Sequence, residues 1–215
     1  MGRPRRHDQR TGRLLLDAAE ELLASSGPEA VSVRNVARAA GTTTRGVYSV
    51  YGSKAGLIEA LAARGYGLLA DIVNDLPMTD DPRADLVTVG LDGFRRFALE
   101  RPHLFRLTFE RAPAEITEVP TVVEAAMTAY AALTCRIDRL RETGAASGLA
   151  TAEIAFMLHA LCTGLASNEL ARQPPPTGVG YWRHVPDLDP ERLWRVALQA
   201  FVDGLSGRAR PPGRA

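Results

Sequence analysis

The stretch Ser32–Lys54, SVRNVARAAGTTTRGVYSVYGSK, constrains the fold of this chain more than any other. It holds three short helical signals, and glycines stand where the chain must turn sharply between them. Gly41 supplies the positive-φ residue that ends the first helix, and Gly52 breaks the chain again before the third. A helix, a glycine turn and a short helix with polar outward residues form the helix-turn-helix pattern. That spacing also occurs in many other helical hairpins.

Capping residues and periodicity divide this stretch into an inner and an outer side. Ser32 is the expected N-cap of the first helix, Thr42 or Thr43 that of a helix over about 43–50, and Ser53 that of the helix that runs from Lys54 toward Asn74. In this second helix Val47 and Tyr51 can reach a core, whereas the remaining side chains cannot all do so. We expect an outward face made of Thr44, Arg45, Tyr48 and Ser49.

The residues before this stretch predict a helix over 14–25 with an apolar stripe. Asp17, Glu20 and Glu21 are expected to face away from that stripe. Residues 1–12 are basic and contain nothing to bury, so we expect a flexible arm that either lies along phosphates or serves as a solubilising tail. A helix-turn-helix DNA-binding domain is expected over 13–60.

The remainder, 61–206, predicts a second helical domain. Amphipathic helices are expected over 83–100, 120–143 and 190–206, and a nearly all-apolar helix over 151–171. A short helix follows Pro102, and a disordered tail is expected over 207–215. No strand pattern or repeat appears. The sequence therefore predicts an all-α fold of about nine helices, with an N-terminal three-helix helix-turn-helix domain and a C-terminal helical domain.

Charge distribution supports a polyanion-binding front. Residues 1–65 carry ten basic against six acidic side chains, although the net charge of the whole chain is only +1. No apolar run approaches the ~18 residues of a membrane span. Cys135 and Cys162 lie in apolar helical contexts and are expected to be small buried residues in a reducing compartment. We expect a cytoplasmic protein.

Residues 14–58 resemble the DNA-binding domain of the TetR family of ligand-controlled transcriptional repressors. The residues that match the family's pattern in register are Ser32, Val33, Arg34, Val36, Ala37, Ala40, Gly41, Val47, Tyr48, Tyr51, Lys54 and Leu57. Two positions depart from it, because Tyr51 replaces the usual phenylalanine and Val50 stands where a histidine is common. The segment FRRFALERPHLFRLTF is similar, more weakly, to the effector domain of one subgroup.

The resemblance implies roles on DNA for individual residues. Lys54 aligns with a phosphate-binding lysine and Tyr48 with a DNA-contacting tyrosine. Arg45 is the best candidate for reading a guanine, and the alternative is that it points at a phosphate. The full set of expected DNA contacts is Arg34, Thr43, Thr44, Arg45, Gly46, Tyr48, Ser49 and Lys54.

The resemblance also implies an effector and a dimer. A small apolar or amphipathic molecule would bind inside the body, shift the helix that starts at Lys54 and release a palindromic DNA operator. The candidate lining residues, each of which can instead be ordinary core, are Phe94, Phe97, Phe105, Phe109, Met127, Tyr130, Met157 and His159. A homodimer is expected through the helices near 151–171 and 190–206.

Two other functional classes compete with this interpretation. An enzyme is disfavoured, because the chain has no hydrolase, metalloprotease or phosphate-loop motif, and the His159/Cys162 pair has no third group to orient it. We expect no catalytic residue, metal or cofactor. A DNA-binding activator, or an architectural protein without a ligand, stays open.

Overall fold

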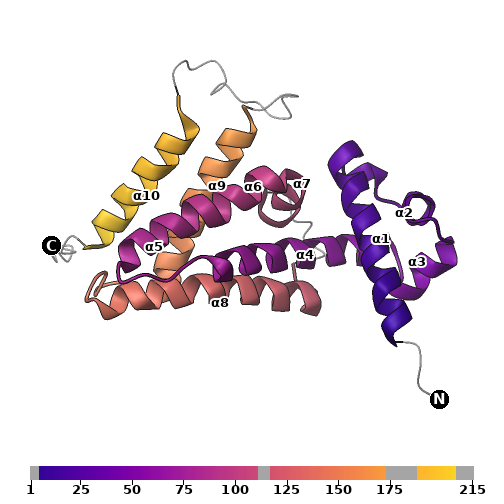
Figure 1. Ribbon diagram of the computed structural model, residues 1–215, viewed down its shortest axis with the longest axis horizontal. Coiled ribbons are helices and arrows are strands. Elements are labelled where there is room, and N and C mark those ends of the chain that lie inside the picture. The colour runs from indigo at the N-terminus through magenta and orange to yellow at the C-terminus, as the bar shows by residue number, and fades with distance from the viewer. Residues whose placement is uncertain (1–4, 111–116, 173–187, 207–215) are drawn as a thin grey trace, which may run out of the picture. The chain divides into compact units, whose positions relative to one another are not determined.

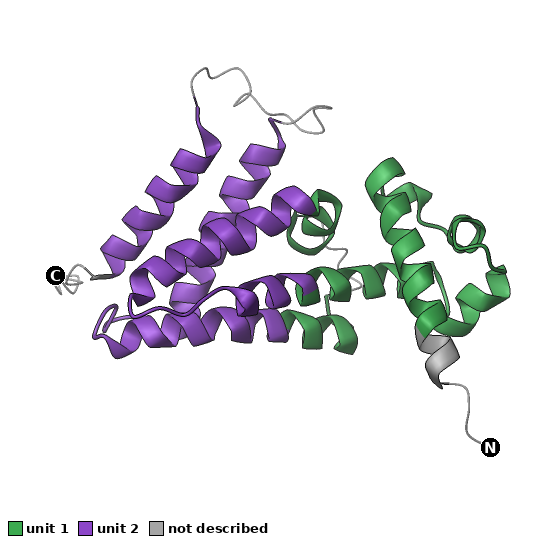
Figure 2. Cartoon of the chain, viewed as in Figure 1, with its two compact units in different colours: residues 1–67, 101–126 green, residues 68–100, 127–215 purple. Residues whose placement is uncertain are grey.

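A computed structural model describes residues 5–110, 117–172 and 188–206 of the chain, with side chains from residue 10 to residue 205. Within these ranges the fold is all-α, as expected, and contains no strand (Figure 1). The tail expected over 207–215 lies outside the described residues. The chain forms two compact units, shown in Figure 2: unit 1 is 1–67 with 101–126, and unit 2 is 68–100 with 127–215.

Unit 1 contains the helix-turn-helix stretch and a returning segment from later in the chain. Its elements are α1 (Arg5–Ser26), a 3₁₀ turn η1 (Pro28–Ala30), α2 (Val33–Ala39), α3 (Thr44–Tyr51), the first part of α4 (Lys54–Asp75), α7 (Pro102–Phe105), the π-helical η3 (Arg106–Glu110) and the start of α8 (Pro120–Glu142). α1 contacts α2, α3 and α7. Residues 5–12 are helical where the sequence led us to expect a flexible arm.

Unit 2 is a bundle of the remaining helices. It contains the rest of α4 and α8, α5 (Pro82–Thr88), the π-helical η2 (Val89–Arg95), α6 (Arg96–Glu100), α9 (Thr151–Leu170) and α10 (Pro190–Ser206). η2 interrupts the single helix expected over 83–100. Gly90 lies in this interruption, where Leu198 of α10 packs so closely that a Cβ could not fit. The wider π turn therefore brings backbone against α10.

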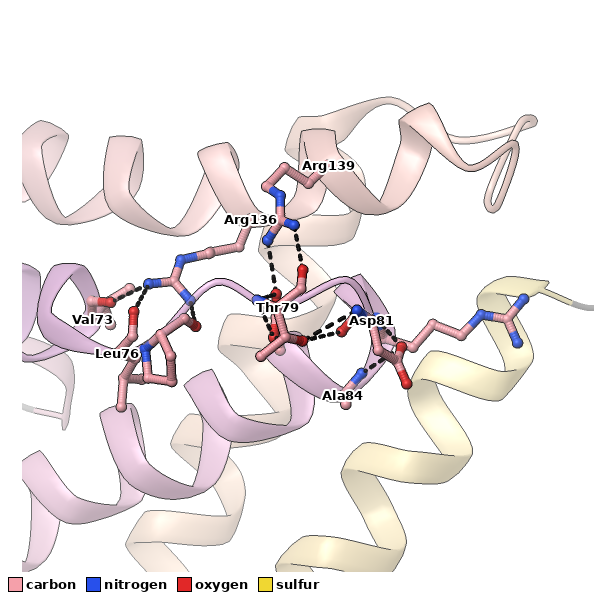
Figure 3. A network of polar contacts seen from close by, with 10 residues as sticks. Val73, Leu76, Thr79, Asp81, Ala84, Arg136 and Arg139 are labelled. Atoms are coloured by element: carbon pink, nitrogen blue, oxygen red, sulfur yellow. Dashed lines mark hydrogen bonds and ion pairs between the residues drawn. The ribbon is translucent and has the colours of Figure 1, made fainter.

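A buried arginine organises one end of unit 2 (Figure 3). The Arg136 side chain is 1% exposed and donates to the carbonyl oxygens of Val73 (2.7 Å), Leu76 (2.7 Å) and Pro77 (3.0 Å) at the C-terminal end of α4. The Val73 carbonyl lies in the last turn of α4, at the negative end of the helix dipole, and it also accepts from the backbone N–H of Leu76 at 3.3 Å, whereas Leu76 and Pro77 follow the helix. Arg136 thus fastens the end of α4 to α8.

Arg139, one turn further along α8, holds the next loop (Figure 3). It pairs with the buried Asp85 carboxylate at 2.7 Å, and Asp85 also accepts hydrogen bonds from the backbone N–H and the hydroxyl of Thr79. Burial by itself would raise the pKa of Asp85, but the hydrogen bonds from Thr79 and Arg139 hold this pKa below its usual value.

The inward face of α8 differs from expectation. Met127 and Tyr130 were expected inside but are exposed, whereas Ile137 and Leu140 are buried as expected, together with Val122, Ala132 and Arg136. Cys135, expected to be buried, is exposed as well. The physical reason is Arg136, because turning this side chain inward rotates the neighbouring apolar residues outward.

No helix among the described residues is long and apolar enough to cross a membrane.

Candidate nucleic-acid interface

Side-chain caps fix both helices of the helix-turn-helix. The Ser32 hydroxyl accepts from the backbone N–H of Asn35 at 3.2 Å, and the Thr43 hydroxyl accepts from that of Gly46 at 3.3 Å. Between them Gly41 has a φ of 64°. The capping residues and the glycine turn predicted from the sequence are therefore confirmed, with Thr43 rather than Thr42 as the cap.

A small core sets the direction in which α3 faces. Val36 and Ala37 of α2 and Val47 of α3 are buried. Tyr51, at the end of α3, is half-buried and donates from its hydroxyl to the carbonyl oxygen of Gly12 in α1 at 2.7 Å. Burial raises the pKa of this phenol. The tyrosine in the usual phenylalanine position therefore finds a polar partner and ties α3 to α1.

With Val47 and Tyr51 turned inward, α3 presents an outward face. Thr44, Arg45 and Ser49 are exposed, and the Tyr48 ring is 56% exposed. Val50 also lies at the surface, where it can offer only apolar contact. Of the expected DNA contacts outside α3, Arg34, Thr43 and Lys54 are exposed too. The structure thus leaves accessible the side chains that the sequence assigned to this face.

Gly46 is only half-buried, and the structure gives a local reason for its lack of a side chain. A Cβ at this position would lie 3.0 Å from the Thr42 hydroxyl oxygen, so glycine lets the turn pack against the start of α3. Close approach to DNA stays a prediction for this residue.

The electrostatics of this surface suit a polyanion. No acidic residue occurs between Glu29 and Glu59. The same interval contains four basic side chains, all exposed: Arg34, Arg38, Arg45 and Lys54. Uncompensated basic side chains on α2, α3 and the start of α4 can contact phosphates and base edges.

Sequence reasoning missed Gly56, in the first turn of α4. A Cβ there would overlap the backbone carbonyl oxygen of Tyr51 and would lie 3.1 Å from its carbonyl carbon. Its backbone N–H donates to the Ser53 hydroxyl at 3.1 Å, which confirms the predicted cap. A glycine in a helical first turn carries no local signal of such an approach, because the neighbour belongs to the preceding helix.

Glu20 of α1 is a second finding that the apolar pattern did not predict. It was expected to face away but is only 5% exposed. Its carboxylate pairs with Arg64 of α4 at 3.0 Å, Arg101 before α7 at 2.9 Å and His103 of α7 at 3.3 Å. The hydrogen bond from His103 lowers the pKa of Glu20, burial opposes this, and the charges of Arg64 and Arg101 lower it further.

A lowered pKa makes this cluster's contribution to stability dependent on pH. The contribution is present above the carboxyl's unfolded pKa of 4.5 and is lost as the pH falls through the lower, folded value.

The candidate effector-lining residues separate into different places. In unit 2, Phe94 meets His159 edge to face, with ring centres 6.1 Å apart, and Phe97 is fully buried. In unit 1, Phe105 and Phe109 lie against each other, with ring centres 5.8 Å apart. The other three, Met127, Tyr130 and Met157, are exposed in the single chain.

The His159 and Cys162 side chains are poorly suited to nucleophilic chemistry. Burial lowers the pKa of His159 and raises the pKa of Cys162 to about 12, so this thiol stays protonated at neutral pH. No cluster of metal-ligating side chains occurs among the described residues.

Solved structures share this fold. A protein of unknown function from Rhodococcus sp. RHA1 has a TM-score of 0.76 and 21% identity, covering 95% of this chain and 100% of that one. FadR from Bacillus subtilis, in complex with stearoyl-CoA, has a TM-score of 0.67 and 16% identity over 89% and 98%. NalD, the secondary repressor of the MexAB-OprM multidrug efflux pump in Pseudomonas aeruginosa, has a TM-score of 0.63 and 20% identity over 94% and 98%.

Sequence families give the assignment. No curated protein matches the chain. The family of bacterial regulatory proteins called tetR matches residues 15–61, and the tetracyclin repressor-like C-terminal domain matches residues 86–201, which is more than half of the chain. The chain therefore belongs to the TetR family of bacterial regulatory proteins, which are DNA-binding transcription regulators and not enzymes.

Proposed function

We propose that this protein is a cytoplasmic repressor that binds a palindromic operator as a homodimer and is released by a small apolar or amphipathic molecule. The observation that carries the proposal is the acid-free surface of α2, α3 and the start of α4, on which the candidate DNA-contacting side chains are exposed. In this arrangement α3 enters the major groove, Arg45 reads a base edge, and Tyr48 and Lys54 hold phosphates.

Arg45 and Lys54 give a matched test of reading against positioning. Arg45→Ala is expected to cost about 1–3 kcal/mol at one base position and to relax the sequence preference there. Lys54→Ala should instead weaken all duplexes alike and reduce the slope of log affinity against log salt by about one. Fluorescence anisotropy with the operator and single-base variants measures both effects. If Arg45→Ala keeps the base preference of wild type, Arg45 does not read a base.

The dimer is supported by an apolar surface on two adjacent helices. In α9 the exposed row begins with Phe156, which is 72% exposed, and continues through Met157, Ala160 and Gly164. In α10 the corresponding row is Leu193, Val196, Ala200 and Gly204. α9 and α10 contact each other, and no charged residue lies between Glu153 and Glu169 of α9. A second copy offers the same apolar rows in return, as an isologous interface requires.

Val196→Asp tests this interface. The aspartate would enter the dimer contact without a partner, so the dimer dissociation constant should rise about 100-fold or more. Operator affinity should fall with it, because each half-site needs one copy. Met127→Asp is the matched control, since Met127 and Val196 are both 55% exposed but Met127 lies on α8. Sedimentation velocity that finds Val196→Asp still dimeric, or wild type monomeric, would contradict the proposed seam.

Repression and effector release are tested on the promoter. Deleting the gene should raise transcription from the operator-bearing promoter. If the protein were an activator, the deletion would lower this transcription, and if it were an architectural protein, the deletion would cause no specific change. Stearoyl-CoA, the molecule bound by FadR from Bacillus subtilis, is a suitable first amphipathic probe for release of the operator in vitro.

A further inference from the structure

The cluster around Glu20 joins three parts of unit 1 that are distant in sequence. Glu20 lies on α1, Arg64 on α4, and Arg101 and His103 at the start of α7. Residues 68–100, which lie between Arg64 and Arg101 in the sequence, belong to unit 2. The chain therefore leaves unit 1, builds part of unit 2, and returns at Arg101 to a carboxylate buried in the DNA-binding half.

A second set of contacts holds the same returning segment. The hydroxyl of Tyr66 on α4 donates to the carbonyl oxygen of Thr108 in η3 at 3.0 Å. The Tyr66 ring meets Phe109 edge to face, with ring centres 5.3 Å apart. α7 and η3 are therefore fixed to α4 as well as to α1.

We infer that Glu20 is a positioning residue for operator binding, because it holds α1 to the segment that follows Arg101. The inference rests on the proposed function. Glu20 touches no DNA in this arrangement; it acts through α1, which packs against α2 and α3 and receives the Tyr51 hydroxyl at Gly12. Arg101 directly follows α6 in the sequence, so Glu20 binds the residue at which the chain re-enters unit 1.

The buried position of Glu20 makes this link strong. Three donors converge on a carboxylate that solvent barely reaches, so loss of one donor leaves a partly uncompensated charge. Asp17, one turn earlier on α1, provides a contrast: it pairs with the same Arg64 at 2.6 Å, but its side chain is half-exposed, and among the described residues its ion pair is with Arg64 and not with α7. Its removal should therefore matter little.

Operator binding is more sensitive to this link than non-specific binding. Two copies must place their α3 helices at fixed positions on the bases, whereas non-specific affinity depends on phosphate contacts. A loosened α1 therefore lowers affinity for the operator selectively. Glu20→Gln raises the net charge of the protein by one, because it removes a carboxylate, and Arg101→Gln lowers the net charge by one. An effect common to both variants therefore cannot come from net charge.

The test compares Glu20→Gln, Arg101→Gln, the double variant and Asp17→Asn with wild type. Affinities are measured for the duplex that wild type selects from random DNA and for a scrambled duplex of equal length. Glu20→Gln and Arg101→Gln should each weaken binding to the selected duplex five- to thirtyfold. Each should change the affinity for the scrambled duplex by less than twofold. The affinity of the double variant for the selected duplex should be no more than about twofold below that of the weaker-binding single variant, because both substitutions break the same link. Asp17→Asn should stay within twofold of wild type.

Two outcomes overturn the inference: an unchanged affinity of Arg101→Gln for the selected duplex, or an equal loss on both duplexes. If wild type selects no duplex at all, the proposed function fails instead. Hydrogen exchange of the free protein then still tests the link, because Arg101→Gln should speed exchange of the α1 amides around Glu20. Unchanged exchange would refute the link itself.

Discussion

Gly56→Ala is expected to destabilise the protein by about 2–3 kcal/mol and to weaken operator binding more than about tenfold. The added methyl group would overlap the carbonyl oxygen of Tyr51, and that oxygen is held in place because it accepts from the backbone N–H of Ser53 at 2.7 Å. Gly52, with a φ of 69°, already turns the chain sharply between α3 and α4. The clash can be relieved only by moving α3 away from α4, which displaces the outward face of α3.

Gly67→Ala is the matched control for this change. It alters the same helix by the same methyl group, but no atom lies within 4 Å of the new Cβ. Alanine in an unobstructed helix position should stabilise the protein by about 0.5–1 kcal/mol. Urea unfolding together with anisotropy on the operator gives both quantities. If Gly56→Ala and Gly67→Ala change the free energy of unfolding equally, the protein accommodates a methyl group beside the Tyr51 carbonyl without loss of stability, and the prediction is wrong.

Arg136→Met should lower the free energy of unfolding by about 3 kcal/mol or more. Methionine retains the apolar stem but no donor, so the carbonyls of Leu76 and Pro77 lose the guanidinium that they bind, and the Val73 carbonyl keeps only the backbone N–H of Leu76 at 3.3 Å. Arg136→Lys should recover only part of the loss, because a single ammonium group cannot reproduce the planar fork of the guanidinium.

Arg141→Met serves as the control on the same helix. Arg141 is exposed near the end of α8, and its replacement should change stability by less than about 0.5 kcal/mol. Chemical unfolding with a common slope for all variants measures the differences. A change below about 1 kcal/mol in Arg136→Met would mean that water replaces the guanidinium at these carbonyls.

The sequence predicted the parts of this protein that depend on local chemistry. Caps at Ser32, Thr43 and Ser53 act within three residues of themselves, and Gly41 acts on its own backbone, so each can be inferred without knowledge of the fold. The outward face of α3 follows equally from periodicity. These features fix most of the candidate DNA surface.

Charged residues inside the protein escaped prediction. An apolar stripe assigns Glu20 and Arg136 to the surface, because burial of a charge is costly unless partners compensate for it. Those partners come from positions more than 40 residues away, Arg64 for Glu20 and Val73 for Arg136, and periodicity does not reveal such pairs. The error at Arg136 also placed Met127 and Tyr130 inside.

The return of residues 101–126 to unit 1 limits how this regulator can be recombined with others. A fragment cut at residue 60, the boundary that the sequence indicates, would keep Glu20 but lose Arg64, Arg101 and His103, all three of the side chains that bind its carboxylate. A chimaera that gives this DNA-binding half a foreign sensor domain should therefore carry residues 101–110 as well. Exchange of sensor domains between related regulators then requires three crossovers within the gene: after residue 67, before Arg101, and after α7 and η3.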